Sequence, residues 1–229
     1  MNIEKNFFVV LMVGPPGSGK GTQAKLLAEK FGLYHFITSQ ILREYFESHN
    51  DPETRRQKKI FEEGKLVEPR WVLERVKEKT IELMKDPSIK GIVYDGSPRT
   101  LYEAENLIPF LAERVGRDNI VVLEIDVSPQ EIKKRLGKRL ICSGSAEHIF
   151  IRSDKLKPGS ECPEGDGVLK ERDLDKAEII ETRIEEYQRR TKPGLDYLKE
   201  KYRVVRINGE QSIEDVHKEI TKKLERWLE

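Results

Sequence analysis

The chain lacks the features that mark several classes of protein. Its 229 residues include only two cysteines, Cys142 and Cys162, too few for a disulfide framework. The longest apolar run covers 7–13, far short of the roughly 20 residues of a membrane helix, and the N-terminus carries no secretory signal pattern. Lys and Arg number 42 against 41 Asp and Glu, so no charge excess indicates nucleic acid or a membrane surface as partner. We therefore expect a cytoplasmic protein without either partner.

Short apolar runs that favour strands recur along the chain, with helical sequence between them. They cover 7–13, 33–37, 92–95, 120–127 and 202–207. This alternation predicts an α/β fold, a five-stranded parallel sheet flanked by helices on both faces in a doubly wound arrangement. Two helix starts are also predicted, since Ser128 is followed by Pro129 and Glu131, and Ser212 precedes another helical pattern.

A glycine-rich segment, GPPGSGKGT from Gly14 to Thr22, connects the first predicted strand to a helix. Its glycines let backbone N–H groups approach a ligand, and the following helix presents its N-terminus to an anion. Lys20 adds a mobile positive charge. The generic phosphate loop has Ser or Thr directly after this Lys, whereas here the hydroxyl comes one residue later, at Thr22. The alternative, a tight turn without a ligand, leaves four glycines and a lysine unexplained, so we predict nucleotide phosphate binding.

The regular alternation fails between residues 139 and 173, where Gly, Ser and Pro are frequent. Ile149, Phe150 and Ile151 are still suited to a short strand. Long loops in compact domains are usually functional. We therefore expect an inserted flap in this region.

Several segments after the phosphate loop resemble one family in order and spacing. They are HFITSQILREYF, EGKLVEP, GIVYDGSPRT, the pair Arg135 and Arg139, and ERDLD followed by Arg183. Together with GPPGSGKGT they resemble the adenylate kinase family of nucleoside monophosphate kinases, over essentially the full length. The resemblance implies a P-loop kinase core (1–37, 69–139 and 172–229) with two inserted mobile parts. These are an NMP-binding lobe (38–68) and a LID, the flap (140–171).

The resemblance also implies an activity. It is the reversible, Mg²⁺-dependent transfer of a phosphoryl group from ATP to AMP, giving two ADP, by a monomer whose partners are these nucleotides. The catalytic residues are then Lys20, Arg99, Arg139, Arg172 and Arg183. ATP contacts are implied at Gly14, Gly17, Ser18, Gly19, Lys20, Gly21, Thr22, Arg135, Arg139 and Gly209. AMP contacts are implied at Thr38, Arg43, Val67, Gly96, Arg99, Glu103, Arg172 and Arg183.

Physical chemistry supports a role for the arginines, because phosphoryl transfer needs positive charge around the migrating group. Arg135 and Arg139 lie four residues apart, which predicts that they share one helix face. The family pattern stacks the first on the ATP base and brings the second to its phosphates. The alternative for each arginine is a solvated helix or a surface salt bridge.

Two sets of acidic residues are candidates for ordering this charge. Asp95 ends a predicted strand beside the phosphate loop, where a carboxylate can hold Mg²⁺ through water, with the Thr22 hydroxyl near the same ion. The alternative for Asp95 is a turn residue before Gly96. The family usually has two adjacent aspartates after the residue matching Arg172, whereas here Asp173 and Asp175 flank a leucine. The sequence leaves open which of them orders the closed flap.

The flap departs from the family in its cysteines. Some relatives have a four-cysteine zinc site here, but this chain has Cys142 and Cys162 with Ser145 and Gly165 at the other two positions. Zinc prefers four good ligands, so we expect no zinc and a reduced flap. His148, Glu164 or Asp166 are the alternative ligands, and oxidation of the two thiols to a disulfide is a further alternative.

The predicted acceptor site differs from the family pattern at two residues. Ser97 replaces a usual Phe, and Glu103 stands where the family commonly has a Gln that reads the acceptor adenine. An ionised Glu only accepts hydrogen bonds, which suits guanine, whereas Thr38 keeps the family's adenine-side residue. GMP is therefore the first alternative acceptor, unless Glu103 simply faces solvent. A more remote alternative is a non-catalytic nucleotide-binding switch, against which the chain lacks an Asn-Lys-x-Asp motif.

Overall fold

A five-stranded sheet forms the centre of the molecule in the computed structural model, which describes residues 7–145, 148–165 and 167–228. Its order is β2-β3-β1-β4-β8, and all its described pairings are parallel. The strands are β1 (Phe8–Val13), β2 (Tyr34–Ile37), β3 (Gly91–Asp95), β4 (Ile120–Asp126) and β8 (Val204–Asn208). The predicted fold class is confirmed. The last strand starts later than predicted, because the Tyr202 amide still closes a helix by donating to Leu198 O.

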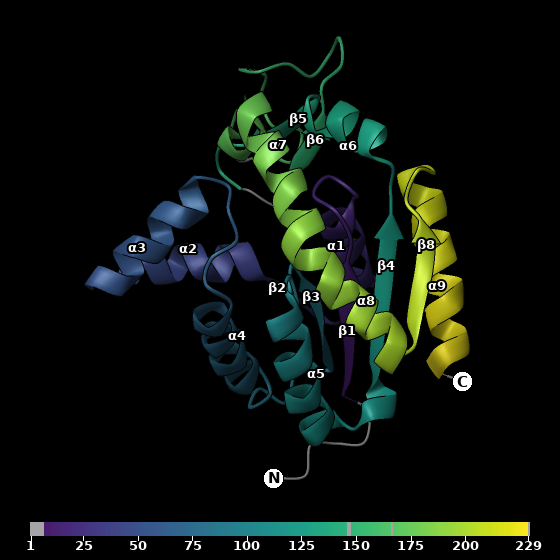
Figure 1. The fold of residues 1–229 in the computed structure, drawn as a ribbon. Coiled ribbons are helices and arrows are strands. Elements are labelled where there is room, and N and C mark those ends of the chain that lie inside the picture. The colour runs from purple at the N-terminus through teal and green to yellow at the C-terminus, as the bar shows by residue number, and fades with distance from the viewer. Residues whose placement is uncertain (1–6, 146–147, 166, 229) are drawn as a thin grey trace.

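Helices cover both faces of this sheet (Figure 1). Side chains alternate across a strand, so Val9, Leu11 and Val13 of β1 join one buried cluster and Val10 and Met12 the other. The first cluster includes residues of α4 (Pro69–Leu83), α5 (Leu101–Val115) and α8 (Lys192–Lys201). The second includes residues of α1 (Lys20–Phe31), α6 (Pro129–Leu136) and α9 (Ile213–Leu228). The continuous apolar run of β1 thus contributes to both cores, as expected for a buried parallel strand.

The predicted helix starts are confirmed by their caps. The Ser128 hydroxyl accepts from Glu131 N at the start of α6, and Ser212 accepts from Asp215 N at the start of α9. Short helical turns lie at η1 (Arg117–Asn119) and η2 (Asp173–Asp175). Helix α7 (Ala177–Glu186) continues through a π-helical turn, η3 (Tyr187–Thr191), into α8.

Two further substructures extend from the sheet. Helices α2 (Thr38–Ser48) and α3 (Pro52–Glu62) project to one side in Figure 1, above α4. The flap is an antiparallel sheet of β5 (Arg139–Cys142), β6 (Ile149–Ile151) and β7 (Leu169–Glu171), in the order β6-β5-β7. The predicted strand at 149–151 is confirmed as β6. The flap has its own small buried cluster of Leu140, Cys142, Cys162 and Leu169.

Candidate functional site

The phosphate loop turns from β1 into α1 at the carboxyl end of the sheet. Only glycine fits at position 14, because the backbone of β4 comes so close that a Cβ there would lie 2.4 Å from Ile125 O. Gly19 has φ +95° and directly precedes α1, a conformation that favours glycine. The Lys20 ammonium donates to Gly14 O at 2.8 Å and to Pro15 O at 2.9 Å. The lysine therefore lies folded over the loop, where phosphate oxygens would compete for its protons.

Lys20 lies in a region of strong positive potential. Burial lowers its pKa to about 7; Asp95 opposes this shift, and Arg99, Arg183 and Arg139 add to it. A bound anion would favour the charged ammonium again. Lys20 of the loop and these three arginines thus form a cluster of positive charge.

A cavity of about 550 Å³ lies beside the loop and brings most of the predicted site together. The predicted ATP residues and magnesium residues all line it, as do four of the predicted acceptor residues. The predicted residues lining the cavity are Gly14, Gly17, Ser18, Gly19, Lys20, Gly21, Thr22, Asp95, Gly96, Arg99, Arg135, Arg139, Arg172, Arg183 and Gly209. Five arginines from separate segments of the chain therefore meet the phosphate loop in one place.

Asp95 is held close to the loop at the end of β3. A Cβ on Gly21 would lie 2.9 Å from Asp95 Oδ2, so a side chain at this position would displace the carboxylate. Burial opposes its negative charge, but His35, whose Nε2 lies 3.8 Å from Oδ2, together with Lys20 and Arg99, keeps the pKa of Asp95 below its ordinary value. Asp95 is thus an ionised carboxylate that faces the same cavity as Thr22.

Asp175 connects two of the cavity arginines. Arg139 donates to its two carboxylate oxygens at 2.6 Å each, and Arg183 Nη1 donates to Oδ1 at 2.7 Å. The side chain of Asp175 is 4% exposed. In contrast, Asp173 is 89% exposed and pairs with Lys176 at 3.0 Å. Of the two aspartates, Asp175 is therefore the one that orders the arginines.

The remaining charge in the cluster is only partly compensated. Burial, followed by Arg139 and Arg183, lowers the pKa of Arg172 to about 9. Burial and Arg139 lower the pKa of Arg183 to about 10, although Asp175 raises it. Positive groups that repel one another in this way are stabilised by a polyanion between them.

The predicted common helix face of Arg135 and Arg139 is wrong. Helix α6 ends at Leu136, Gly137 follows it, and Arg139 begins β5 of the flap. Arg135 instead pairs with Glu131 at 2.9 Å, and its Nη1 lies 3.5 Å from Ser18 O of the loop. The two arginines still line the same cavity, because the chain turns there from the helix into the flap.

Four predicted acceptor residues do not line this cavity: Thr38, Arg43, Val67 and Glu103. The Thr38 hydroxyl forms a buried hydrogen bond of 3.0 Å with Ser97, so the departure at Ser97 changes the contacts of Thr38. The Arg43 guanidinium lies over the Phe61 ring, 5.4 Å from its centroid. Val67 is buried, with 5% exposure.

Glu103 does not face solvent, so the alternative of a solvated carboxylate is wrong. The residue is 3% exposed. Its carboxylate accepts from Arg99 N at 3.0 Å and from the Thr100 hydroxyl at 3.1 Å, while Thr100 caps α5 through Glu103 N. This arrangement is related to a capping box, except that Glu103 accepts from the amide of Arg99, the residue before the cap, and from the Thr100 hydroxyl. Burial raises the pKa of Glu103, although these two hydrogen bonds oppose the shift.

Arg99 is positioned by its neighbouring glycine. A Cβ on Gly96, whose φ is +101°, would lie 2.4 Å from Arg99 Nη2. The guanidinium therefore packs directly against the Gly96 backbone at the end of β3. No larger residue at this position would leave the arginine where it is.

The sequence interpretation missed a link between the two sides of the cavity. Glu186 accepts from Leu66 N at 3.0 Å, and Arg190 donates to Leu66 O at 2.7 Å. Glu186 is 5% exposed and lines the cavity. Glu186 and Arg190 are also paired with each other, at 3.2 Å. Their spacing of four was the only signal, and it is common on solvated helices.

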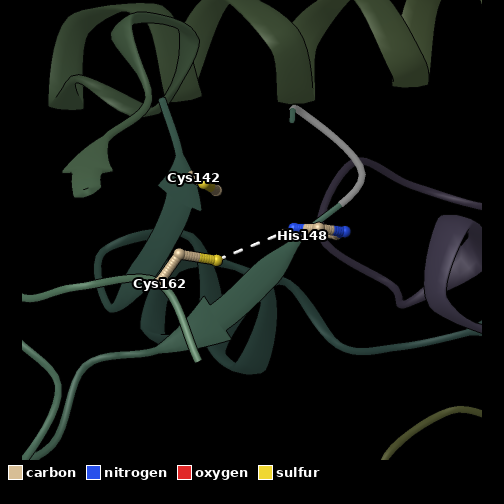
Figure 2. A group of neighbouring side chains, drawn as sticks. All are labelled: Cys142, His148 and Cys162. Carbon is tan, nitrogen blue, oxygen red and sulfur yellow. Dashed lines mark hydrogen bonds between the residues drawn. The ribbon is translucent and has the colours of Figure 1, made fainter. Parts of the chain in front are cut away.

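The two flap cysteines lie together, both as thiols. His148 joins them, with its Nδ1 3.6 Å from Cys162 Sγ (Figure 2). Glu164, one of the alternative ligands, contacts His148 Nε2 at 2.9 Å. Asp166, the other acidic alternative, lies outside the described residues.

The parallel sheet, the phosphate loop on its central strand and the arginines around the cavity define a P-loop phosphotransferase. A model of the adenylate kinase family matches residues 12–203. The chain belongs to the adenylate kinase family.

Curated relatives cover almost the whole chain. An adenylate kinase of Methanothrix thermoacetophila is 38% identical over 220 residues, which are 95% of this chain and 99% of the relative. Those of Caldicellulosiruptor saccharolyticus and Petrotoga mobilis are 36% and 34% identical, over 94% and 92% of this chain and 98% and 94% of their own. Among the described residues, no helix has the length and apolar character needed to cross a membrane.

Proposed function

We propose that the protein catalyses the reversible transfer of the terminal phosphoryl group of ATP to AMP, giving two ADP. The observation that carries this proposal is the convergence of Lys20 and five arginines on one cavity beside the phosphate loop. Transfer between two phosphates needs charge stabilisation and positioning, since the acceptor is already an anion. The relatives described above are adenylate kinases, which supports AMP and gives no support to GMP.

The donor side is formed by the loop and the residues near it. We infer that backbone N–H groups of Gly17 to Thr22 and the N-terminus of α1 hold the ATP phosphates. Lys20 leaves its carbonyl partners for the terminal phosphates. We expect Arg135, which lies beside Ser18 O, and Gly209 to contact the nucleoside end, and Arg139 to contact the phosphates; all three line the cavity.

The acceptor side has its own charges. Arg99, Arg172 and Arg183 reach the phosphate of AMP from three segments of the chain, and Arg43 joins them from α2. We expect the acceptor nucleoside to lie near Thr38, Val67, Gly96 and Glu103, of which only Gly96 lines the cavity described above. An anion that lies between arginines that repel one another binds more strongly as its negative charge grows. The arginines therefore bind the transition state, where this charge is largest, more strongly than the substrates.

Mg²⁺ is the metal that the family implies, and the residues present fit it. Asp95 is ionised, faces the cavity and comes close to the loop at Gly21. The Thr22 hydroxyl lines the same cavity, and oxygen ligands of this kind suit Mg²⁺. When bound, the ion neutralises phosphate charge. Asp95, through water, and Thr22 would hold it.

Closure of two mobile parts completes the proposed mechanism. The lobe at 38–68 and the flap at 140–171 both contribute to the lining of the cavity: Phe61, Lys65 and Leu66 line it from the lobe, Ile149 and Ile151 from the flap. Closing them would exclude water, so that the phosphoryl group reaches AMP and is not hydrolysed.

Activity with ATP and a panel of nucleoside monophosphates tests the proposal. We expect ADP to form with AMP, and expect a chelator to abolish the reaction and added Mg²⁺ to restore it. Turnover of GMP without turnover of AMP would contradict the assignment of the acceptor. Nucleotide binding without transfer to any monophosphate would instead identify a binding switch.

We also propose that the enzyme acts as a monomer in the cytoplasm. The monomer is what the family resemblance implies, and two cysteines as thiols suit a reducing compartment. Size-exclusion chromatography with light scattering tests the first point, because a stable dimer would elute at about twice the 26.6 kDa of the chain.

A further inference from the structure

A second cavity, of about 620 Å³, lies beside the phosphate loop, and the proposed transfer does not use it. Pro15 lines it from the loop. The rest of its lining comes from the carboxyl ends of β4 and β8, the start of α6 and the helical segment from α7 to α8 (Figure 1). Among the described residues, the two cavities share only Tyr187 in their linings. The second cavity is therefore a separate site.

The Glu124 carboxylate in this cavity has only one of its two oxygens satisfied. Its neighbours Leu123 and Ile125 pack into the cluster on the α1 face, so the alternation along β4 directs Glu124 towards α8. Lys199 Nζ of α8 donates to Oε1 at 2.9 Å. Oε2 is buried and has no hydrogen-bond partner in the part of the chain that the structure describes. Glu124 is 5% exposed, and a buried charged oxygen without a partner is costly. A hydrogen-bond donor in the cavity would remove this cost.

Asp196 brings a second carboxylate to the cavity, from α8. It lies three residues before Lys199, and residues at this spacing share a helix face. Within the described residues, the Asp196 carboxylate forms no hydrogen bond or ion pair. Two carboxylates with oxygens free for a ligand thus line the cavity from different elements, Glu124 from β4 and Asp196 from α8.

The electrostatic character of the cavity favours a cation. Acidic residues in the lining outnumber basic ones: they are Glu124, Asp126, Asp196 and Glu210, against Lys192, Lys199 and Arg206. Asp126 is paired with Arg206, so the free carboxylate oxygens named above have the greatest need of a partner. Burial raises the pKa of Tyr187 to about 12, and Glu124, Asp126 and Asp196 add to the shift. The negative potential of three carboxylates therefore converges on one residue of the cavity wall.

The size and the apolar walls of the cavity indicate which class of cation it takes. Its volume is in the range of small-molecule sites, about 300 to 1,000 Å³. Four aliphatic side chains line it together with the charged groups: Val127, Ile132, Ile184 and Leu195. A hard metal ion prefers oxygen ligands on all sides, whereas a methylene chain gains from contact with apolar side chains. An organic ammonium ion therefore suits the cavity better than a metal ion does.

We propose that this second cavity binds an aliphatic diammonium ion. One ammonium group donates to Glu124 Oε2 and the other to Asp196, while the methylene chain lies against the aliphatic wall. Lys199 occupies only Oε1 of Glu124, so the ligand adds to this ion pair and does not replace it. Hydrogen bonds between two charged groups are the strong kind, and two of them at the ends of one chain select a doubly charged ligand.

Calorimetric titration of the full chain with diaminobutane, at low ionic strength and without nucleotide, tests the site independently of catalysis. We expect saturable binding of one diamine per chain. Butylamine, which has the same chain length and one charge, should bind about tenfold more weakly or worse. Ca²⁺ is titrated as the metal alternative. Absence of saturable diamine binding, equal affinity for butylamine, or tighter binding of Ca²⁺ than of diaminobutane would each overturn the proposal.

Variants assign the two carboxylates. Glu124→Gln and Asp196→Asn should each weaken diaminobutane binding by about tenfold. Glu200→Gln is the matched control, because Glu200 is an exposed acid of the same helix that does not line the cavity. If Glu124→Gln fails to fold, Asp196→Asn decides, since Asp196 is exposed on α8. Equal affinities in Asp196→Asn and Glu200→Gln would refute the assignment.

Two further variants distinguish this site from general attraction and from the nucleotide cavity. Lys199→Gln should strengthen diaminobutane binding, because it removes a positive charge that competes for Glu124. Asp95→Asn should leave the affinity unchanged, because Asp95 lines only the nucleotide cavity. Weaker binding in Lys199→Gln would contradict the proposed contact with Glu124. Loss of binding in Asp95→Asn would place the diamine in the nucleotide cavity and overturn the proposal.

Discussion

Replacing Asp175 by Asn tests whether this carboxylate, rather than any acidic residue nearby, holds Arg139 and Arg183 in place. The substitution keeps the size of the side chain but removes the charge that receives Arg139 and Arg183. Two guanidiniums would then face an amide in a nearly buried position. Asp173→Asn is a matched control, since Asp173 lies two residues away and is 89% exposed.

The expected loss follows from the burial of the three groups. Removing one partner of a buried ion pair costs about 3 to 5 kcal/mol. The lower end, about 3 kcal/mol, applies here because Arg139 and Arg183 retain 13% and 18% exposure. For a chain of this size that corresponds to a fall of roughly 6 to 12 °C in the melting temperature. Asp173→Asn should change it by about 2 °C or less, because exposed pairs contribute little.

Thermal unfolding of both variants, without nucleotide and with saturating ATP, provides the measurement. ATP should reduce the loss in Asp175→Asn, because its phosphates supply negative charge to the same arginines. An equal loss in the two variants, or no loss in Asp175→Asn, would refute the reasoning. A loss that ATP leaves unchanged would place the phosphates elsewhere.

Four further predictions follow from the site. Arg172→Ala should lower kcat by about 10³ or more in a coupled ADP assay, and an unchanged kcat would remove Arg172 from the mechanism. Gly96→Ala, which displaces Arg99, should raise the KM for AMP by about tenfold. Gly159→Ala is the control, because Gly159 has a similar φ of +88° and a Cβ there would meet nothing within 4 Å. Equal KM values for AMP in the two variants would contradict the role of the contact between Gly96 and Arg99. Glu103→Gln should shift the ratio of kcat/KM for AMP to that for GMP by about tenfold towards AMP, and an unchanged ratio would show that Glu103 does not read the base. The pKa of Lys20 falls from 10.5 to about 7 on folding, so the unfolded chain binds more protons than the folded chain between these pH values. The contribution of Lys20 to the free energy of unfolding therefore rises with pH over this range. Lys20→Met should be more stable than the native chain in urea unfolding, by a margin that narrows from pH 7 to pH 9, and a margin that stays constant would contradict the shift.

The sequence predicts the sheet well because each central strand is a short apolar run that ends in turn residues. The runs at 7–13 and 120–127 are buried on both faces, and their composition reflects this directly. The phosphate loop is equally legible, because its glycines meet requirements of the backbone itself. Ser128 predicts its helix for the same reason, since a cap depends only on residues next to it.

The rest of the site depends on contacts between distant segments. Nothing local distinguishes Asp175 from Asp173, and only the position of Arg139 and Arg183 selects between them. Arg139 itself was predicted on a helix because spacing alone does not reveal that Gly137 ends it. His148 was one of three alternative ligands until the antiparallel flap sheet placed it beside Cys162.

Strand β1 precedes the other strands of the described residues, yet it lies in the middle of the sheet, paired with β3 and β4. During synthesis on the ribosome its neighbours emerge only after Asp95 and Asp126 have been added. Until then the strand that carries the phosphate loop has no edge to join, and its apolar side chains stay exposed. A nascent chain should therefore acquire nucleotide-dependent protection from proteolysis only after the segment that ends at Asp126 has left the ribosome.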